Sequence, residues 1–119
     1  MVPHTPSQVT TFERGIELFN RHAFFECHEV LEDLWRLERG PRRLFLQGAI
    51  HLAVGFYHHQ QGNRMGAERQ LRKGLKKLAG YLPECEGIDT ARLYRESTVC
   101  LGQIGHGALL DHFPQIRFL

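Results

Sequence analysis

The sequence predicts an all-α fold, a single-domain multihelical bundle of five to six antiparallel helices, from its residue choice and its proline placement. Sixteen leucines outnumber the ten valines and isoleucines taken together, and β-branched side chains lose rotamer freedom in a helix. Prolines occur only at positions 3, 6, 41, 83 and 114. They leave two long proline-free stretches, 7–40 and 42–82, each long enough for two helices joined by a turn. We therefore expect helices and no strand.

The length of 119 residues fits one domain with its own core. We expect a single helical domain over 1–119, with an N-terminal extension at 1–9, a loop at 83–88 and a tail at 113–119. No apolar run approaches the roughly 18 residues that span a bilayer, and residues 1–8 lack the order of a signal peptide. We therefore expect a cytoplasmic protein without a membrane partner. The three cysteines, an odd number without a CxxC pair, fit reduced thiols.

The first two helices have recognisable start and stop signals. The helix at 11–20 follows Thr10, and Glu13 stands three residues later in capping-box order. The helix at 23–38 is followed by Gly40-Pro41, where we expect the glycine to take a left-handed conformation and the proline to prevent continuation. Its apolar residues recur at spacings of three and four, which predicts a buried stripe: Phe24, Cys27, Leu31 and Leu34.

The third helix, at about 43–61, is the most apolar and is expected to be central. Gly62-Asn63 ends it and caps a fourth helix that continues to Leu82. A fifth helix begins at a cap formed by Asp89 or Thr90. Glycines at 102, 105 and 107 predict a break or a short sixth helix near Leu109. The tail from Pro114 is apolar enough to lie against the bundle.

The net charge of +2 conceals an internal split. Residues 13–38 hold seven acids against three bases, whereas residues 39–77 hold nine bases against one acid. We expect the two parts to face each other or to face different partners. The basic face of the fourth helix has no interleaved aromatic, which favours a solvated face or docking on an acidic patch over nucleic-acid binding. It consists of Arg69, Arg72, Lys73, Lys76 and Lys77.

Polar side chains form a strip on each of two neighbouring helices. A helical projection places His28, Glu32 and Trp35 together at one edge of the second helix, with Glu29 beside them. On the third helix the corresponding strip contains Gln47, His51 and His58, beside the small residues Gly48 and Gly55. Antiparallel packing of these helices would form a small polar pocket from His28, Glu32, Gln47, His51 and His58, walled by Trp35 and Tyr57.

A divalent metal is one occupant that such a pocket suggests. His28 and Glu32 stand four residues apart, so both can reach one zinc, iron or manganese ion, and Glu29 occupies the general-base position of a zincin-like pattern. His51 and His58 are separated by about 10.5 Å along the axis, so at most one of them completes a site. The alternative is a hydrogen-bonded His–Glu pair at the edge of the core.

Two further features favour structural roles. Cys27 lies at the centre of the apolar stripe, so we expect a core thiol and not a nucleophile activated by His28. Gly55, Ala67, Leu71 and Gly74 have the offsets of one close-packed helix hairpin in a tetratricopeptide repeat. A shift of 34 residues finds no second copy, so we expect one such hairpin within a bundle.

The strips also belong to a longer pattern that resembles a known family. The pattern contains Phe19-Asn20, Phe24-Phe25-Glu26, His28-Glu29, Leu31-Glu32, Trp35, Phe45, Gln47-Gly48, Ile50, Ala53, Tyr57-His58, Gly62-Asn63 and Ala67. Over roughly residues 11–82 it resembles the bacterial and archaeal family called domain of unknown function 309. The resemblance implies an all-α cytoplasmic protein, without an assigned activity, whose shared polar residues are Glu26, His28, Glu29, Glu32, Gln47, His58 and Asn63. His51 departs from the pattern, since many relatives are expected to have glutamine there.

Two functions remain open from the sequence. The first is binding of a small polar ligand or a metal ion, with His28, Glu29, Glu32, Trp35, Gln47, His51 and His58 as binding residues and Asn63 as a helix cap. The second is a non-enzymatic protein-interaction module, in which the polar strip is structural. The sequence assigns no catalytic residue, and we expect a homodimer in either case.

Overall fold

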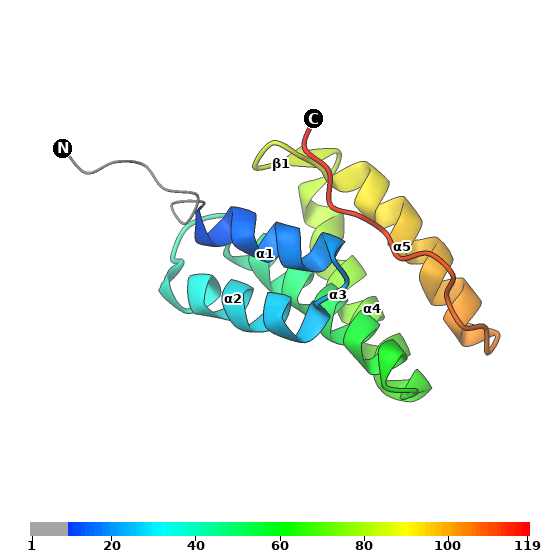
Figure 1. Cartoon of the computed structure of the whole chain (residues 1–119). Coiled ribbons are helices and arrows are strands. Elements are labelled where there is room, and N and C mark those ends of the chain that lie inside the picture. The colour runs from blue at the N-terminus through cyan, green and yellow to red at the C-terminus, as the bar shows by residue number, and fades with distance from the viewer. Residues whose placement is uncertain (1–9) are drawn as a thin grey trace.

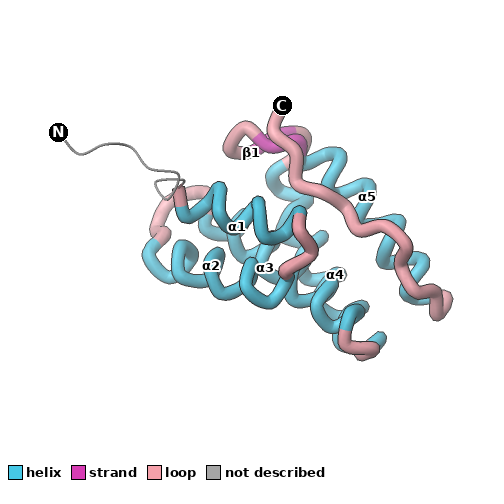
Figure 2. The backbone as a smooth tube through the Cα atoms, in the orientation of Figure 1, coloured by secondary structure: helices cyan, strands magenta, loops and turns pink. Residues whose placement is uncertain are grey.

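The computed structural model describes residues 10–119, which form five α-helices and a short two-stranded ribbon (Figures 1 and 2). The elements in chain order are α1 (Thr11–Asn20), α2 (Phe24–Leu37), α3 (Arg43–Gln60), α4 (Arg64–Leu78), a 3-10 turn (Ala79–Tyr81), β1 (Glu84–Cys85), β2 (Ile88–Asp89) and α5 (Thr90–Gly105). The predicted all-α multihelical fold is confirmed. The expected N-terminal extension, including the segment considered as a signal peptide, lies outside the described residues.

Side-chain caps fix the starts of three helices as the sequence predicts. The hydroxyl of Thr10 accepts a hydrogen bond from the Glu13 amide (3.1 Å). The side chain of Asn63 accepts one from the Gly66 amide (2.9 Å), and that of Asp89 accepts one from the Arg92 amide (3.0 Å). Each bond satisfies an N–H that the first helical turn leaves without a backbone partner.

The turn between α2 and α3 differs from the prediction. Gly40 is not left-handed; α2 ends at Leu37, and Glu38 already has an extended backbone. The carboxylate of Glu38 then holds the turn, because it accepts from the Gly40 amide (2.8 Å) and from Arg42 Nε (2.7 Å). These two hydrogen bonds keep the pKa of Glu38 below its ordinary value. A left-handed residue does occur in the turn between α1 and α2, at His22 (φ 64°).

The second half of the chain contains two further departures and one agreement. The fourth helix ends at Leu78 and not at Leu82, and a 3-10 turn follows it. The segment expected to be a plain loop contains β1 and β2, because Glu86 and Gly87 both have positive φ (54° and 75°) and form the tight turn of a hairpin. Within the described residues no sixth helix follows α5, which ends at Gly105 as the predicted break requires.

The helices and the C-terminal tail pack around α3. Helix α3 lies between α2 and α4, and the tail runs back between α1 and α5 (Figure 1). Asn20 on α1 holds the tail, since its side chain donates to the Ile116 carbonyl (2.9 Å) and accepts from the Ile116 amide (2.7 Å). Ile116 is buried. The expectation that the tail lies against the bundle is therefore confirmed.

The closest helix contact is between α3 and α4. A Cβ placed on Gly74 would lie 2.9 Å from the Gly48 carbonyl oxygen, and one on Gly55 would lie 2.8 Å from Leu71. The predicted close-packed hairpin is thus confirmed, and glycine is required where the two backbones meet. The other face of α3 meets a cluster of aromatic rings contributed by Phe19, Phe24, Phe56 and Phe113.

Cys27 lies in this core and is fully buried, as expected, and burial raises the pKa of its thiol to about 12. All three cysteines are free thiols within the described residues.

Across residues 10–119, no helix combines the length and the apolar character needed to cross a membrane.

Candidate functional site

A hollow of about 200 Å³ lies between the start of α2 and the second half of α3. It is lined by Phe24, Phe25, His28, Val54, Tyr57 and His58. The antiparallel packing of the two helices brings these residues together from positions about thirty apart in the sequence. Of the residues that the sequence predicted for a pocket, the hollow contains His28, His58 and the wall residue Tyr57.

Aromatic side chains form most of its surface. The ring of Phe24 is 1% exposed and is anchored in the core. The ring of Phe25 is 48% exposed, with its centroid 5.3 Å from that of Tyr57 and 5.2 Å from that of His28. Phe25 therefore remains in contact with solvent at the position where a bound group would cover it.

His28 is held by two contacts at the edge of the hollow. Its Nδ1 lies 2.9 Å from the Phe25 carbonyl oxygen and donates a hydrogen bond to it. Its Nε2 lies 3.3 Å from a carboxylate oxygen of Glu32, one helical turn away. Because Nδ1 donates its proton to a carbonyl, Nε2 can donate to Glu32 only when the imidazole carries both protons, and in that form the contact is an ion pair. The position of the two side chains is that of the His–Glu pair which the sequence offered as the alternative to a metal site.

Glu32 is shared with a further partner. Its second carboxylate oxygen accepts a hydrogen bond from Arg36 (2.8 Å), whose other nitrogen reaches Asp33 (3.1 Å). Glu32 is thus part of a chain of charged groups along the surface of α2. Glu29 is exposed on the outer side of the same helix. Over residues 10–119, no three His, Cys, Asp or Glu side chains come together in a way that could hold a metal ion.

His58 is oriented by the cap of the next helix. Asn63 Nδ2 lies 3.3 Å from His58 Nδ1 and donates to it, while the same Asn63 side chain caps α4. In the neutral ring this contact places the proton on Nε2, an assignment that follows from the partner. Asn63 therefore acts as the helix cap that the sequence predicted, and it also fixes the imidazole at the end of the hollow.

His51 faces α4 and does not line the hollow. Its Nδ1 donates to the side-chain oxygen of Gln70 (2.7 Å). Burial lowers its pKa against the effect of that hydrogen bond, and the nearby charges of Lys77 and Lys73 lower it further. The projection placed His51 on the strip expected to face α2, and this expectation is wrong, because the side chain turns toward α4, where Gln70 offers a hydrogen-bond partner.

Trp35 and Gln47 also lie apart from the hollow. Seven residues separate Trp35 from His28, which is about 10.5 Å along a helix. There Trp35 packs beneath Arg43, whose guanidinium carbon is 4.0 Å from the ring centroid. Gln47 lies eleven residues from His58 on α3, about 16 Å along the axis. A shared helix face does not bring residues together when they lie at opposite ends of it.

The hollow also contains three residues that the sequence analysis did not select for a site, namely Phe24, Phe25 and Val54. Phe25 could have been found, because a large aromatic on the polar side of an amphipathic helix is unusual. Val54 could not, since its spacing is that of an ordinary core residue.

Comparison with known proteins covers this region. The family model described as Domain of unknown function (DUF309) matches residues 12–70, a range that includes all six residues of the hollow. The uncharacterized protein YpuF of Bacillus subtilis (strain 168) is 37% identical over 82 residues, which are 66% of this chain and 47% of that protein. The chain thus spans about half the length of this curated relative. The chain belongs to the DUF309 family.

Proposed function

We propose that this chain is a non-enzymatic binding module that takes one small apolar group in the hollow between α2 and α3. The observation that carries the proposal is an apolar hollow bordered by a half-exposed phenylalanine. An aromatic ring at such a position gains free energy when a bound group removes it from water. The proposal keeps the location of the pocket expected from the sequence and changes the chemistry of its occupant from polar to apolar.

The size of the hollow limits the occupant. A volume of about 200 Å³ is close to that of the engineered cavities, on the order of 150 Å³, that hold a benzene ring. One aromatic ring or one branched aliphatic group therefore fits. Such a group can come from a small molecule or from the side chain of a partner protein.

The polar residues at the edge support a binding role better than a reactive one. His28 and His58 each have a ring nitrogen held by a protein partner, which fixes both rings as walls. The donor set supports a metal ion less well, because His28 and Glu32 are the two candidate ligands and Glu32 already accepts a hydrogen bond from Arg36. Five of the six lining residues also belong to the pattern through which the chain resembles its family.

The proposal is tested by titrating ¹⁵N-labelled protein with indole. We expect saturable shifts of amides near residues 24–28 and 54–58. Val54→Phe fills the hollow and should weaken binding at least tenfold. Leu37→Phe is the matched control, because Leu37 is exposed at the far end of α2 and should leave binding unchanged. Unchanged indole affinity in Val54→Phe, or shifts spread over the whole surface, would refute the proposal.

A second candidate function is self-association through the charged faces of α2 and α4. Glu26, Glu29 and Asp33 are exposed on α2, and Arg69 and Lys73 are exposed on α4. Since α3 lies between the two helices, a two-fold axis along α3 would place α2 of one copy opposite α4 of the other. Opposite charges would then meet twice in one interface.

Sedimentation equilibrium distinguishes this candidate from the first. Glu29→Lys and Arg69→Glu should each weaken a wild-type dimer, and an equimolar mixture of the two variants should restore association. Glu84→Lys, an exposed change outside both helices, serves as the control. A monomeric wild type would remove the second candidate and leave the first intact.

A further inference from the structure

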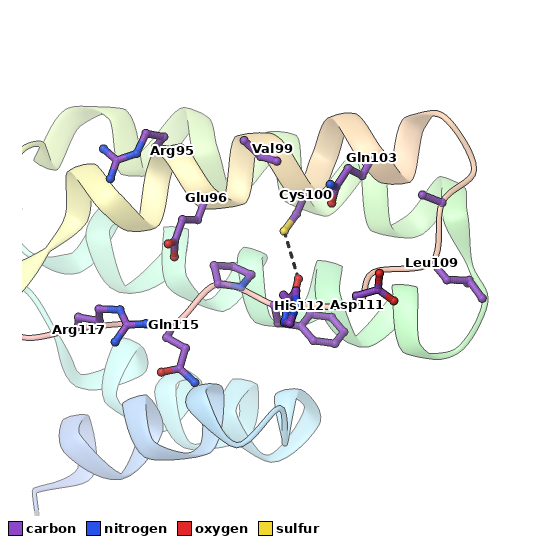
Figure 3. A pocket seen from close by; sticks show the side chains of 13 residues that line it. Arg95, Glu96, Val99, Cys100, Gln103, Leu109, Asp111, His112, Gln115 and Arg117 are labelled. Atoms are coloured by element: carbon purple, nitrogen blue, oxygen red, sulfur yellow. Dashed lines mark hydrogen bonds between the residues drawn. The ribbon is translucent and has the colours of Figure 1, made fainter.

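A larger groove of about 780 Å³ lies on the opposite part of the molecule, between α5 and the C-terminal tail (Figure 3). Arg95, Val99 and Gln103 line it from successive turns of α5, and tail residues 108, 109, 111–115 and 117 form the other wall. At 1.5 Å per residue, the α5 side extends for about 12 Å between Arg95 and Gln103. Its volume is in the range typical of small-molecule sites, about 300–1,000 Å³.

Positive charge gathers at one end of this groove. Figure 3 shows Arg95 and Arg117 at the same end, from opposite walls. Neither arginine forms an ion pair within residues 10–119. The nearby carboxylate of Glu96 is paired with Arg92 (3.1 Å). Two guanidinium groups are thus available to an anion, which they can bind through paired N–H donors.

The middle and far end of the groove combine apolar side chains with the polar Gln103 and His112 and one acid, Asp111. Val99 is 56% exposed and Leu109 is 83% exposed, and the tail adds Phe113 and Pro114. Asp111 stands near Leu109, away from the two arginines (Figure 3). An anionic head is therefore attracted to the arginine end and repelled at the other, while a hydrocarbon chain can cover Val99 and Leu109.

Cys100 lines the floor without adding charge. Its thiol points toward the carbonyl oxygen of His112 (Sγ to O 3.9 Å). Burial raises the pKa of this thiol to about 11, so it remains neutral near pH 7. The floor is consequently compatible with a hydrocarbon chain.

We propose that this groove binds an amphipathic anion, a carboxylate attached to a medium-length hydrocarbon chain, with the head between Arg95 and Arg117 and the chain along Val99. The groove lies outside residues 12–70, which the family model matches, and it shares no residue with the hollow between α2 and α3. Failure of the proposal for one site therefore leaves the proposal for the other site unaffected.

The test uses sodium octanoate, with octan-1-ol as the neutral chain of the same length and acetate as the head alone. Octanoate should give saturable amide shifts over residues 95–103 and 108–117. Octanol and acetate should each bind at least tenfold more weakly. Equal affinity for octanoate and octanol would overturn the proposal, and so would octanoate shifts confined to the α2–α3 hollow.

Variants test which part of the groove binds the carboxylate head and which part binds the hydrocarbon chain. Arg95→Gln with Arg117→Gln should weaken octanoate binding at least tenfold and leave octanol binding unchanged. The matched control is Arg69→Gln with Arg72→Gln, two exposed arginines on α4. Val99→Asp should weaken both probes. All are surface changes, and circular dichroism checks that each variant is folded. Octanoate affinity that is equal in the arginine variant and in the control would contradict the assigned position of the head.

Discussion

The contact between α3 and α4 makes a quantitative prediction about glycine. In Gly74→Ala the added methyl group would lie 2.9 Å from the Gly48 carbonyl oxygen and 2.9 Å from Leu52 Cδ2. A backbone oxygen cannot rotate away as a flexible side chain can, so the two helices must separate. Overpacking of this kind costs about 1–3 kcal/mol. Alanine also contributes about 1 kcal/mol of helix propensity relative to glycine, which offsets part of the loss.

Gly102→Ala separates these two contributions. Gly102 lies in α5, and a Cβ placed there meets no atom of residues 10–119 within 4 Å. The control should therefore be stabilised by about 0.5–1 kcal/mol. The difference between the two variants isolates the overpacking cost, so Gly74→Ala should be about 1–3 kcal/mol less stable than Gly102→Ala in urea unfolding. Equal stabilisation of both variants would refute the close contact between α3 and α4.

Three further predictions concern pH, the tail and the thiols. Burial lowers the pKa of His51 and His59 below 6.5, so the unfolded chain binds more protons than the folded chain, and the free energy of unfolding should fall as the pH decreases below 6.5. Urea midpoints should show this fall, and glutamine at both positions should reduce it. Asn20→Ala removes both side-chain hydrogen bonds to Ile116 and should lower the free energy of unfolding by about 1–3 kcal/mol. The Ile116 amide should also exchange its hydrogen faster, and an unchanged exchange rate would show that Asn20 does not hold the tail. With Ellman's reagent at pH 8, the half-buried Cys85 should react before the two buried thiols, and Cys85→Ser should remove this first phase; its persistence in that variant would show that another thiol reacts first.

The fold was predictable where local signals agreed. Caps at Thr10, Asn63 and Asp89 and the small residues of the α3–α4 hairpin depend on neighbours within one turn or one hairpin, so residue type is sufficient. The β1–β2 hairpin was missed because Glu86-Gly87 is a weak turn signal between very short strands. The left-handed position was assigned to Gly40, but an ion pair between Glu38 and Arg42 closes that turn instead.

The candidate site was only partly predictable. The projection identified His28 and His58 because both follow the helical period and lie at the paired ends of α2 and α3. A projection down the helix axis discards the height along the helix, which the rise of 1.5 Å per residue supplies, so Trp35 and Gln47 were grouped with residues more than a helical turn away. It also could not show that Gln70 on α4 would attract His51. The polar and apolar period of one helix carries no information about side-chain partners on a third helix.

The most direct test of the binding role is a measurement of intermolecular nuclear Overhauser effects between indole and the protein. If the hollow takes a small apolar group, indole protons should show contacts to the rings of Phe25 and Tyr57 and to the methyl groups of Val54. These contacts should disappear in Val54→Phe and persist in Leu37→Phe. Contacts elsewhere on the protein, with none to these three residues at saturating indole, would contradict the proposal.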